Sequence, residues 1–79
     1  MSGQLRLIWS NIRRILAEAD MTVDNVVRLT SFLSDRSFAD ANAAARIEAL
    51  GGRPIPTTAI VVQTLDPNWL VEIEVIAAG

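Results

Sequence analysis

The chain has 79 residues, seven basic and nine acidic side chains, and a hydrophobic share of 51%. This length fits one small domain, and the net charge of −2 gives no general attraction for nucleic acid. Cys, His, Tyr and Lys are absent, which excludes disulfide scaffolds, Ser-His-Asp and Cys-His catalysis, lysine Schiff bases and imidazole or thiolate zinc sites.

The apolar content predicts self-association, because a chain this short buries only about 60% of its unfolded surface. No apolar run approaches the roughly 20 residues that a membrane span needs. Residues 1–4 lead directly into an amphipathic pattern, so we expect no secretory signal and a cytoplasmic location. No metal-ligand cluster or Gly-rich phosphate loop is present in the sequence, and we expect no cofactor.

Residues 4–20 are predicted to form an amphipathic helix. Its apolar side chains recur at helical spacing and form one stripe: Leu5, Ile8, Trp9, Ile12, Ile15, Leu16 and Ala19. Trp9 lies in the middle of this stripe, which favours a core anchor over a ligand platform.

The segment 22–25 is predicted to be a single turn capped by Thr22, followed by a strand over 26–34 that is rich in β-branched and aromatic residues. Alternation places one set of side chains on the core face and a mixed set on the other. The core set is Val27, Leu29 and Leu33, and the mixed set is Arg28, Thr30 and Phe32.

A second helix is predicted over 38–50, with Ser37 and Asp40 resembling an N-cap arrangement and Gly51-Gly52 ending the helix. Residues 57–65 are predicted to be a strand. A type I turn at 66–68 then lets residues 69–78 return antiparallel.

The last strand has two different faces. Val71, Ile73, Val75 and Ala77 point one way, whereas Glu72, Glu74, Ile76 and Ala78 point the other. Both helices should cover one face of the sheet, giving an α+β fold of order α-β-α-β-β with one uncovered face. Two carboxylates about 7 Å apart beside Ile76 suggest that this bare face is an interface with another subunit.

Several stretches together resemble the RidA/YjgF family, also known as L-PSP endoribonucleases or translation initiation inhibitors. They are Ile8–Asp35, Phe38 with Asn42 on the second helix, Arg53–Pro54 before a strand, and Val71–Ala77. The resemblance covers essentially the whole chain as a single domain over 1–79. No one motif is decisive, but the order and spacing of the motifs are specific.

The resemblance implies a chorismate-mutase-like fold and a homotrimer with ligand sites in the clefts between subunits. Active members of the family are deaminases, hydrolases that convert reactive enamines and imines to 2-keto acids and ammonia without a cofactor. An arginine holds the substrate carboxylate, and a glutamate on the last strand positions the water.

Relative to the family pattern, this chain begins at the first helix and lacks the N-terminal strands. Counting back from Glu74 puts the position of the carboxylate-binding arginine at Thr57, which is uncharged. Arg53 precedes it by four residues. The sequence therefore indicates a subgroup without that arginine.

The candidate catalytic residue is Glu74, which would orient water, and the candidate substrate-binding residues are Thr57, Thr58, Asn42 and Arg53. Each also has a structural interpretation. For Glu74 the alternative is an inter-subunit hydrogen bond or an ion pair with Arg28. For Thr57 and Thr58 it is an ordinary place in a strand. For Asn42 it is a polar position at a helix–sheet edge, and for Arg53 a solvated loop.

The leading hypothesis is a homotrimer that binds or hydrolyses a small 2-imino or 2-keto acid. The first alternative is a non-catalytic oligomeric protein that binds a small ligand or a partner. The second is an endoribonuclease or translation inhibitor, against which the acidic balance and the absence of His argue.

Overall fold

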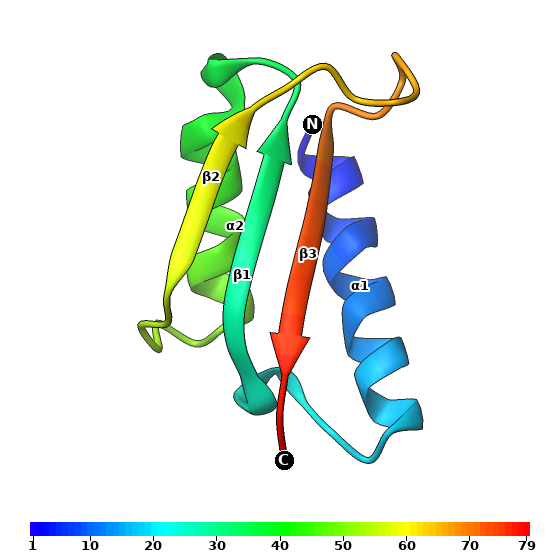
Figure 1. Cartoon of the computed structure of the whole chain (residues 1–79), viewed down its shortest axis with the longest axis vertical. Coiled ribbons are helices and arrows are strands. Elements are labelled where there is room, and N and C mark those ends of the chain that lie inside the picture. The colour runs from blue at the N-terminus through cyan, green and yellow to red at the C-terminus, as the bar shows by residue number, and fades with distance from the viewer.

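Two helices lie on one face of a three-stranded sheet, and the other face has no element over it (Figure 1). The computed structural model describes residues 1–79 and confirms the predicted α+β class and element order. The helices are α1 (Ser2–Glu18) and α2 (Ala39–Ala49), the strands are β1 (Val26–Leu33), β2 (Thr57–Val61) and β3 (Val71–Ala77), and two short 3-10 turns are η1 (Val23–Asn25) and η2 (Arg36–Phe38). Neither helix has the length and apolar character that crossing a membrane requires.

The central strand of the sheet is β1, which runs parallel to β2 and antiparallel to β3. The last strand, β3, therefore runs antiparallel to β2, as predicted. The two are not neighbours, however, because β1 lies between them and pairs with both. The segment between β2 and β3 crosses the end of β1, where the Val62 amide donates to the Leu33 carbonyl (2.8 Å) and the Ser34 amide donates to the Leu70 carbonyl (3.0 Å). The strand β2 ends at Val61, four residues before the predicted end at Leu65.

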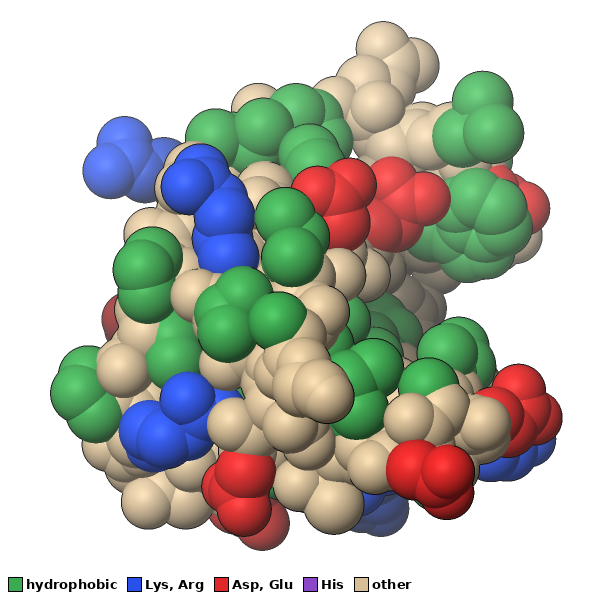
Figure 2. Space-filling view, turned by 60° about the horizontal axis from the view of Figure 1, so that its bottom comes forward, with side chains coloured by type: hydrophobic (Ala, Val, Ile, Leu, Met, Phe, Trp, Pro, Cys, Tyr) green, Lys and Arg blue, Asp and Glu red, His purple; other side chains and the backbone are tan.

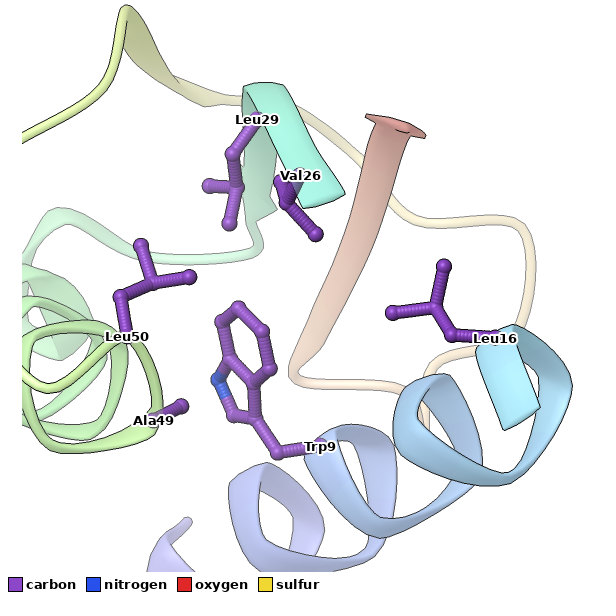
Figure 3. Packing of buried hydrophobic residues seen from close by; sticks show 6 residues of the cluster. All are labelled: Trp9, Leu16, Val26, Leu29, Ala49 and Leu50. Atoms are coloured by element: carbon purple, nitrogen blue, oxygen red, sulfur yellow. The ribbon is translucent and has the colours of Figure 1, made fainter. Parts of the chain in front are cut away.

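The core lies between the helices and the sheet, and Trp9 lies within it with 3% of its surface exposed. Figure 3 shows the larger of two buried clusters: Trp9, Leu16, Val26, Leu29, Ala49 and Leu50. The smaller cluster joins Leu5, Leu33 and Val71. The prediction of Trp9 as a core anchor is confirmed. The prediction that Ile15 belongs to the same buried stripe is wrong, because Ile15 is exposed and its neighbour Leu16 packs in the core.

A bulge at the start of β1 changes which valine is buried. The pairing to β3 shifts register between Val26 and Arg28, and Val26 is fully buried while Val27 is 45% exposed. The predicted placement of Val27 on the core face is therefore wrong, because a bulge inserts one residue and reverses the alternation before it. From Leu29 onward the predicted core positions are buried, including Leu33.

The two neighbouring valines make a matched pair for testing the bulge. Val26→Ala should lower the free energy of unfolding by about 1–3 kcal/mol, because it leaves a cavity in the core. Val27→Ala should change that free energy by less than about 0.5 kcal/mol, as expected of an exposed position. Urea denaturation of both variants measures the difference, and a larger loss for Val27→Ala would contradict the register.

Local hydrogen bonds explain where the helices and turns begin and end. Thr22 caps η1 as predicted, with its hydroxyl accepting from the Asp24 amide at 3.2 Å. The predicted N-cap at Ser37 is wrong, because the Asp35 carboxylate accepts from the Ser37 amide (2.8 Å) and thereby starts η2. Gly51 and Gly52 end α2 at positive φ angles of 63° and 78°, which glycine adopts without steric cost.

Candidate functional site

The open face of the sheet carries rows of side chains that are set by the strand register. Thr30 of β1 pairs with Thr58 of β2 on one side and with Glu74 of β3 on the other. Paired residues project to the same face, so the structure brings Thr58 and Glu74 onto one face, about 10 Å apart across Thr30. This confirms the predicted assignment of Glu74 to the uncovered face.

The rows beside Thr30 mix apolar and charged groups. One row contains Ile60, Phe32 and Glu72, and the other pairs Arg28 with Ile76. Ile60 and Ile76 are 40% and 51% exposed, and Figure 2 shows hydrophobic side chains interspersed with acidic and basic ones over the surface. Apolar surface of this kind on the uncovered face of a sheet is typical of a contact with a partner.

Thr57 and Arg53 lie together in a hollow of about 360 Å³ on the other side of the sheet. Thr57 pairs with the buried Leu29, so it points toward the helices. Arg46, near the end of α2, lines the same hollow and was not predicted from the sequence. The lining residues are Arg46, Ile47, Gly52, Arg53, Pro54, Ile55 and Thr57. Two guanidinium groups and no carboxylate therefore line the hollow, which favours an anion.

Hydrogen bonds hold Arg53 in place at this hollow. Its Nη2 donates to the backbone carbonyls of Val23 (2.7 Å) and Val26 (3.1 Å), while its Nε is buried without a partner. The Thr57 hydroxyl donates to the Ile55 carbonyl at 3.0 Å. Arg53 thus joins the loop before β2 to the start of β1. Arg46 makes no such hydrogen bonds to the backbone, so its guanidinium is available to a ligand.

Asn42 is buried on the helix-facing side, on the same face of α2 as Ala45 and Ala49. Its Oδ1 has no hydrogen-bond partner, and neither does the Oγ of Ser31, a buried residue of β1 that sequence reasoning missed. A small polar residue at a core-facing position of the central strand was the signal that could have identified Ser31. Two unpartnered polar atoms in the core are costly, at about 1–3 kcal/mol each.

A groove of about 790 Å³ opens at the carboxyl ends of β1 and β2. It is lined in part by Ala59, the β2 residue that pairs with Ser31. Its charged lining residues are Asp35, Arg36 and Asp40. The pKa of Asp35 is lowered by the hydrogen bonds that its carboxylate accepts from Ser37. Because the folded pKa lies below the unfolded one, this carboxylate stabilises the fold at neutral pH and loses that effect as the pH falls through the folded pKa.

The candidate residues therefore divide between the two faces of the sheet. Glu74 and Thr58 lie on the open face, whereas Thr57, Arg53 and Asn42 lie on the side that the helices cover. One copy of the chain does not place Glu74 beside the other three. A site that uses all of them needs Glu74 from a second copy.

Comparisons with known proteins agree on one family. The model of the family described as Endoribonuclease L-PSP matches residues 1–79. A YjgF/YER057c/UK114 family member from Mycobacterium tuberculosis is 30% identical with a TM-score of 0.78, over 84% of this chain and 57% of that one. RidA from the Antarctic bacterium Psychrobacter is 25% identical with a TM-score of 0.90, over 98% and 63%.

A Rid-family protein of unknown function from Yersinia pestis is 29% identical with a TM-score of 0.87, over 95% of this chain and 60% of that one. The chain thus spans between 57% and 63% of the length of these three solved structures. No curated protein sequence matches the chain.

Proposed function

The chain belongs to the Endoribonuclease L-PSP family, which includes the RidA and YjgF proteins, and from this membership we propose that it binds a small 2-imino or 2-keto acid and hydrolyses the imino form. The site is a cleft between copies of the chain in a homotrimer. One copy supplies the anion-binding residues and its neighbour supplies Glu74.

The observation that carries this proposal is the hollow lined by Arg46, Arg53 and Thr57 without any carboxylate. A guanidinium matches the planar, bidentate geometry of a carboxylate, which an uncharged threonine cannot reproduce. Arg46 would therefore hold the substrate carboxylate although position 57 is a threonine. The Thr57 hydroxyl lies in the same hollow and supplies a further polar contact.

The proposed chemistry is the addition of water to the C=N bond. Glu74 accepts a proton from water as the water oxygen attacks the imine carbon, and it passes that proton to the imine nitrogen, so that the carbon carries one hydroxyl and one amino group. The hydroxyl proton then moves through the same carboxylate to the amino nitrogen while the C–N bond breaks, and ammonia leaves. The carbon becomes the carbonyl carbon of the 2-keto acid. Glu74 is exposed in one copy, so its role depends on the cleft that the second copy closes.

Binding is tested with pyruvate as the probe in a thermal-shift titration, since a ligand that binds only the native state raises the apparent stability. Arg46→Gln should weaken pyruvate binding by about tenfold or more, because it removes a charge-assisted contact. Arg14→Gln is the matched control, since Arg14 is exposed and bonds only Asn11 on its own helix. Unchanged pyruvate binding by Arg46→Gln would contradict the assignment of the hollow.

Hydrolysis is tested separately by ammonia release from freshly generated 2-iminopropionate. Glu74→Gln should reduce the rate toward background, whereas Glu72→Gln, the neighbouring carboxylate of β3, should retain it. If the unmodified chain itself releases ammonia only at the background rate while still binding pyruvate, the protein is a non-catalytic member that binds small acids.

A further inference from the structure

The strand β3 forms one edge of the sheet and has no strand on its outer side. In an antiparallel ladder, the backbone groups of successive residues point alternately toward the partner strand and away from it. The Ser34 amide donates to the Leu70 carbonyl, so the backbone groups of every second residue from Leu70 onward face β1. The amides and carbonyls of Val71, Ile73 and Val75 therefore point outward, where a further strand can bond them.

The helix α1 extends sideways beyond this edge, so part of its apolar surface has no strand over it (Figure 1). The outer side of α1 begins at Gln4, whose side-chain oxygen accepts from the Leu70 amide at 2.9 Å. Ile8 and Ile15 follow Gln4 by four and eleven residues, a spacing that places all three on one side of the helix. Figure 2 shows the surface hollowed on this side of the molecule.

The core is incompletely covered at the same edge. Leu29 of the central strand is 1% exposed, whereas Ile73 and Val75 of β3 are only half-buried and Ile15 is 63% exposed. The helix α1 and the strand β3 run in the same direction (Figure 1). Counted from the contact of Gln4 at the start of β3, Ile15 lies level with Val75, because eleven helical residues and five strand residues both rise about 16 Å. An added strand with apolar side chains toward α1 would bury these residues, which is favourable.

The open face of this edge is acidic. Glu72 and Glu74 pair with Phe32 and Thr30 of β1, so neither carboxylate has a basic residue directly opposite. Opposite charges on adjacent strands attract each other, and like charges repel. Basic side chains on an added strand are therefore favoured beside the two glutamates. A second copy of β3 fits poorly, because an antiparallel pairing centred on Ile73 sets Glu72 against Glu74.

We propose that the free edge of β3 binds an extended peptide segment of another protein in which apolar and basic residues alternate. The peptide backbone bonds the outward groups of Ile73 and Val75, its apolar side chains lie over the isoleucines of α1, and its basic side chains lie beside the glutamates of β3. The other edge offers no such match, because β2 has no charged side chain and α2 lies directly behind it (Figure 1). This binding does not depend on imine hydrolysis.

The probe is a seven-residue peptide of alternating arginine and valine with blocked ends, and the readout is amide hydrogen exchange followed by NMR. The peptide should bind with a Kd of about 1 mM or tighter and should slow exchange at Ile73 and Val75, whose amides gain acceptors. Ala59 and Val61 of the opposite edge strand should exchange at an unchanged rate. A peptide with glutamate in place of arginine should bind at least about tenfold more weakly, because it places like charges beside Glu72.

Surface variants of the chain assign the contacts. Ile15→Asn should weaken binding of the arginine–valine peptide by about tenfold, because it removes apolar surface that the peptide covers. Leu7→Asn is the matched control and should leave the Kd unchanged, since Leu7 is 62% exposed and points about 100° away from Ile8 around the helix. Glu72→Gln should weaken binding by about two- to fivefold, because it removes one attractive charge.

Three results with the peptide would each overturn the proposal: slowed exchange at Ala59 and Val61 instead of Ile73 and Val75, equal binding of the glutamate peptide, or unchanged binding by Ile15→Asn. Slowing of exchange at the β3 amides that increases with the concentration of the chain alone would assign this edge to a second copy, and it would overturn the proposal as well.

Discussion

Replacing Trp9 with alanine is expected to lower the free energy of unfolding by about 3–5 kcal/mol, as large-to-small changes of buried aromatic residues do. Trp9 joins α1 to β1 and to the end of α2 within the larger core cluster. A domain of this size is expected to have a total stability of only about 4–12 kcal/mol. The variant should therefore lose a large share of that stability, measured by urea denaturation followed by circular dichroism.

The matched control is the other tryptophan of the chain. Trp69 is 45% exposed. Its backbone amide donates to the Asp66 carbonyl and its backbone carbonyl accepts from the Thr64 hydroxyl, and neither hydrogen bond depends on the side chain at position 69. Trp69→Ala should cost less than about 1 kcal/mol. Equal losses for the two variants would show that Trp9 is not the anchor between the helices and the sheet.

A charge placed on the open face of the sheet is expected to dissociate the proposed homotrimer. Ile60 is 40% exposed in one copy and lies on the open face in a row with Phe32 and Glu72, which contains no basic residue. Ile60→Asp would bury an unpaired carboxylate at the proposed contact between copies, which costs several kcal/mol, while changing the fold of a single copy little. Light scattering should then report a smaller mass for the variant with an unchanged circular dichroism spectrum.

Leu65→Asp is the control for a general effect of added charge. Leu65 is 89% exposed and lies in the segment that connects β2 to β3, away from the open face. This variant should keep the mass of the unmodified protein. If Ile60→Asp keeps that mass too, the open face is not the contact between copies.

The spacing of apolar residues in the sequence was sufficient to predict features that lie within a single helix or strand. The two faces of β3 followed from its sequence, because nothing interrupts the alternation between Val71 and Ala77. The burial of Trp9 followed from its place in a helical stripe, and the end of α2 followed from the adjacent Gly51 and Gly52.

Features that depend on contacts between elements were not predicted. The alternation of β1 placed Val27 in the core, because no local signal marks the bulge that buries Val26 instead. Arg46 joins Arg53 and Thr57 only because the end of α2 and the start of β2 meet in space. The division of the candidate residues between two faces likewise appeared only with the register, which places Thr57 opposite Leu29 and Glu74 opposite Thr30.

That division leads to the central claim, that the uncovered side of the sheet is a contact between copies and that a neighbour completes the site. The native mass in solution tests this claim most directly. Light scattering at micromolar concentration should report three times the 8.6 kDa of the chain. A well-folded species of 8.6 kDa under the same conditions would contradict the claim and would leave Glu74 on a solvated surface, away from the arginines of the hollow.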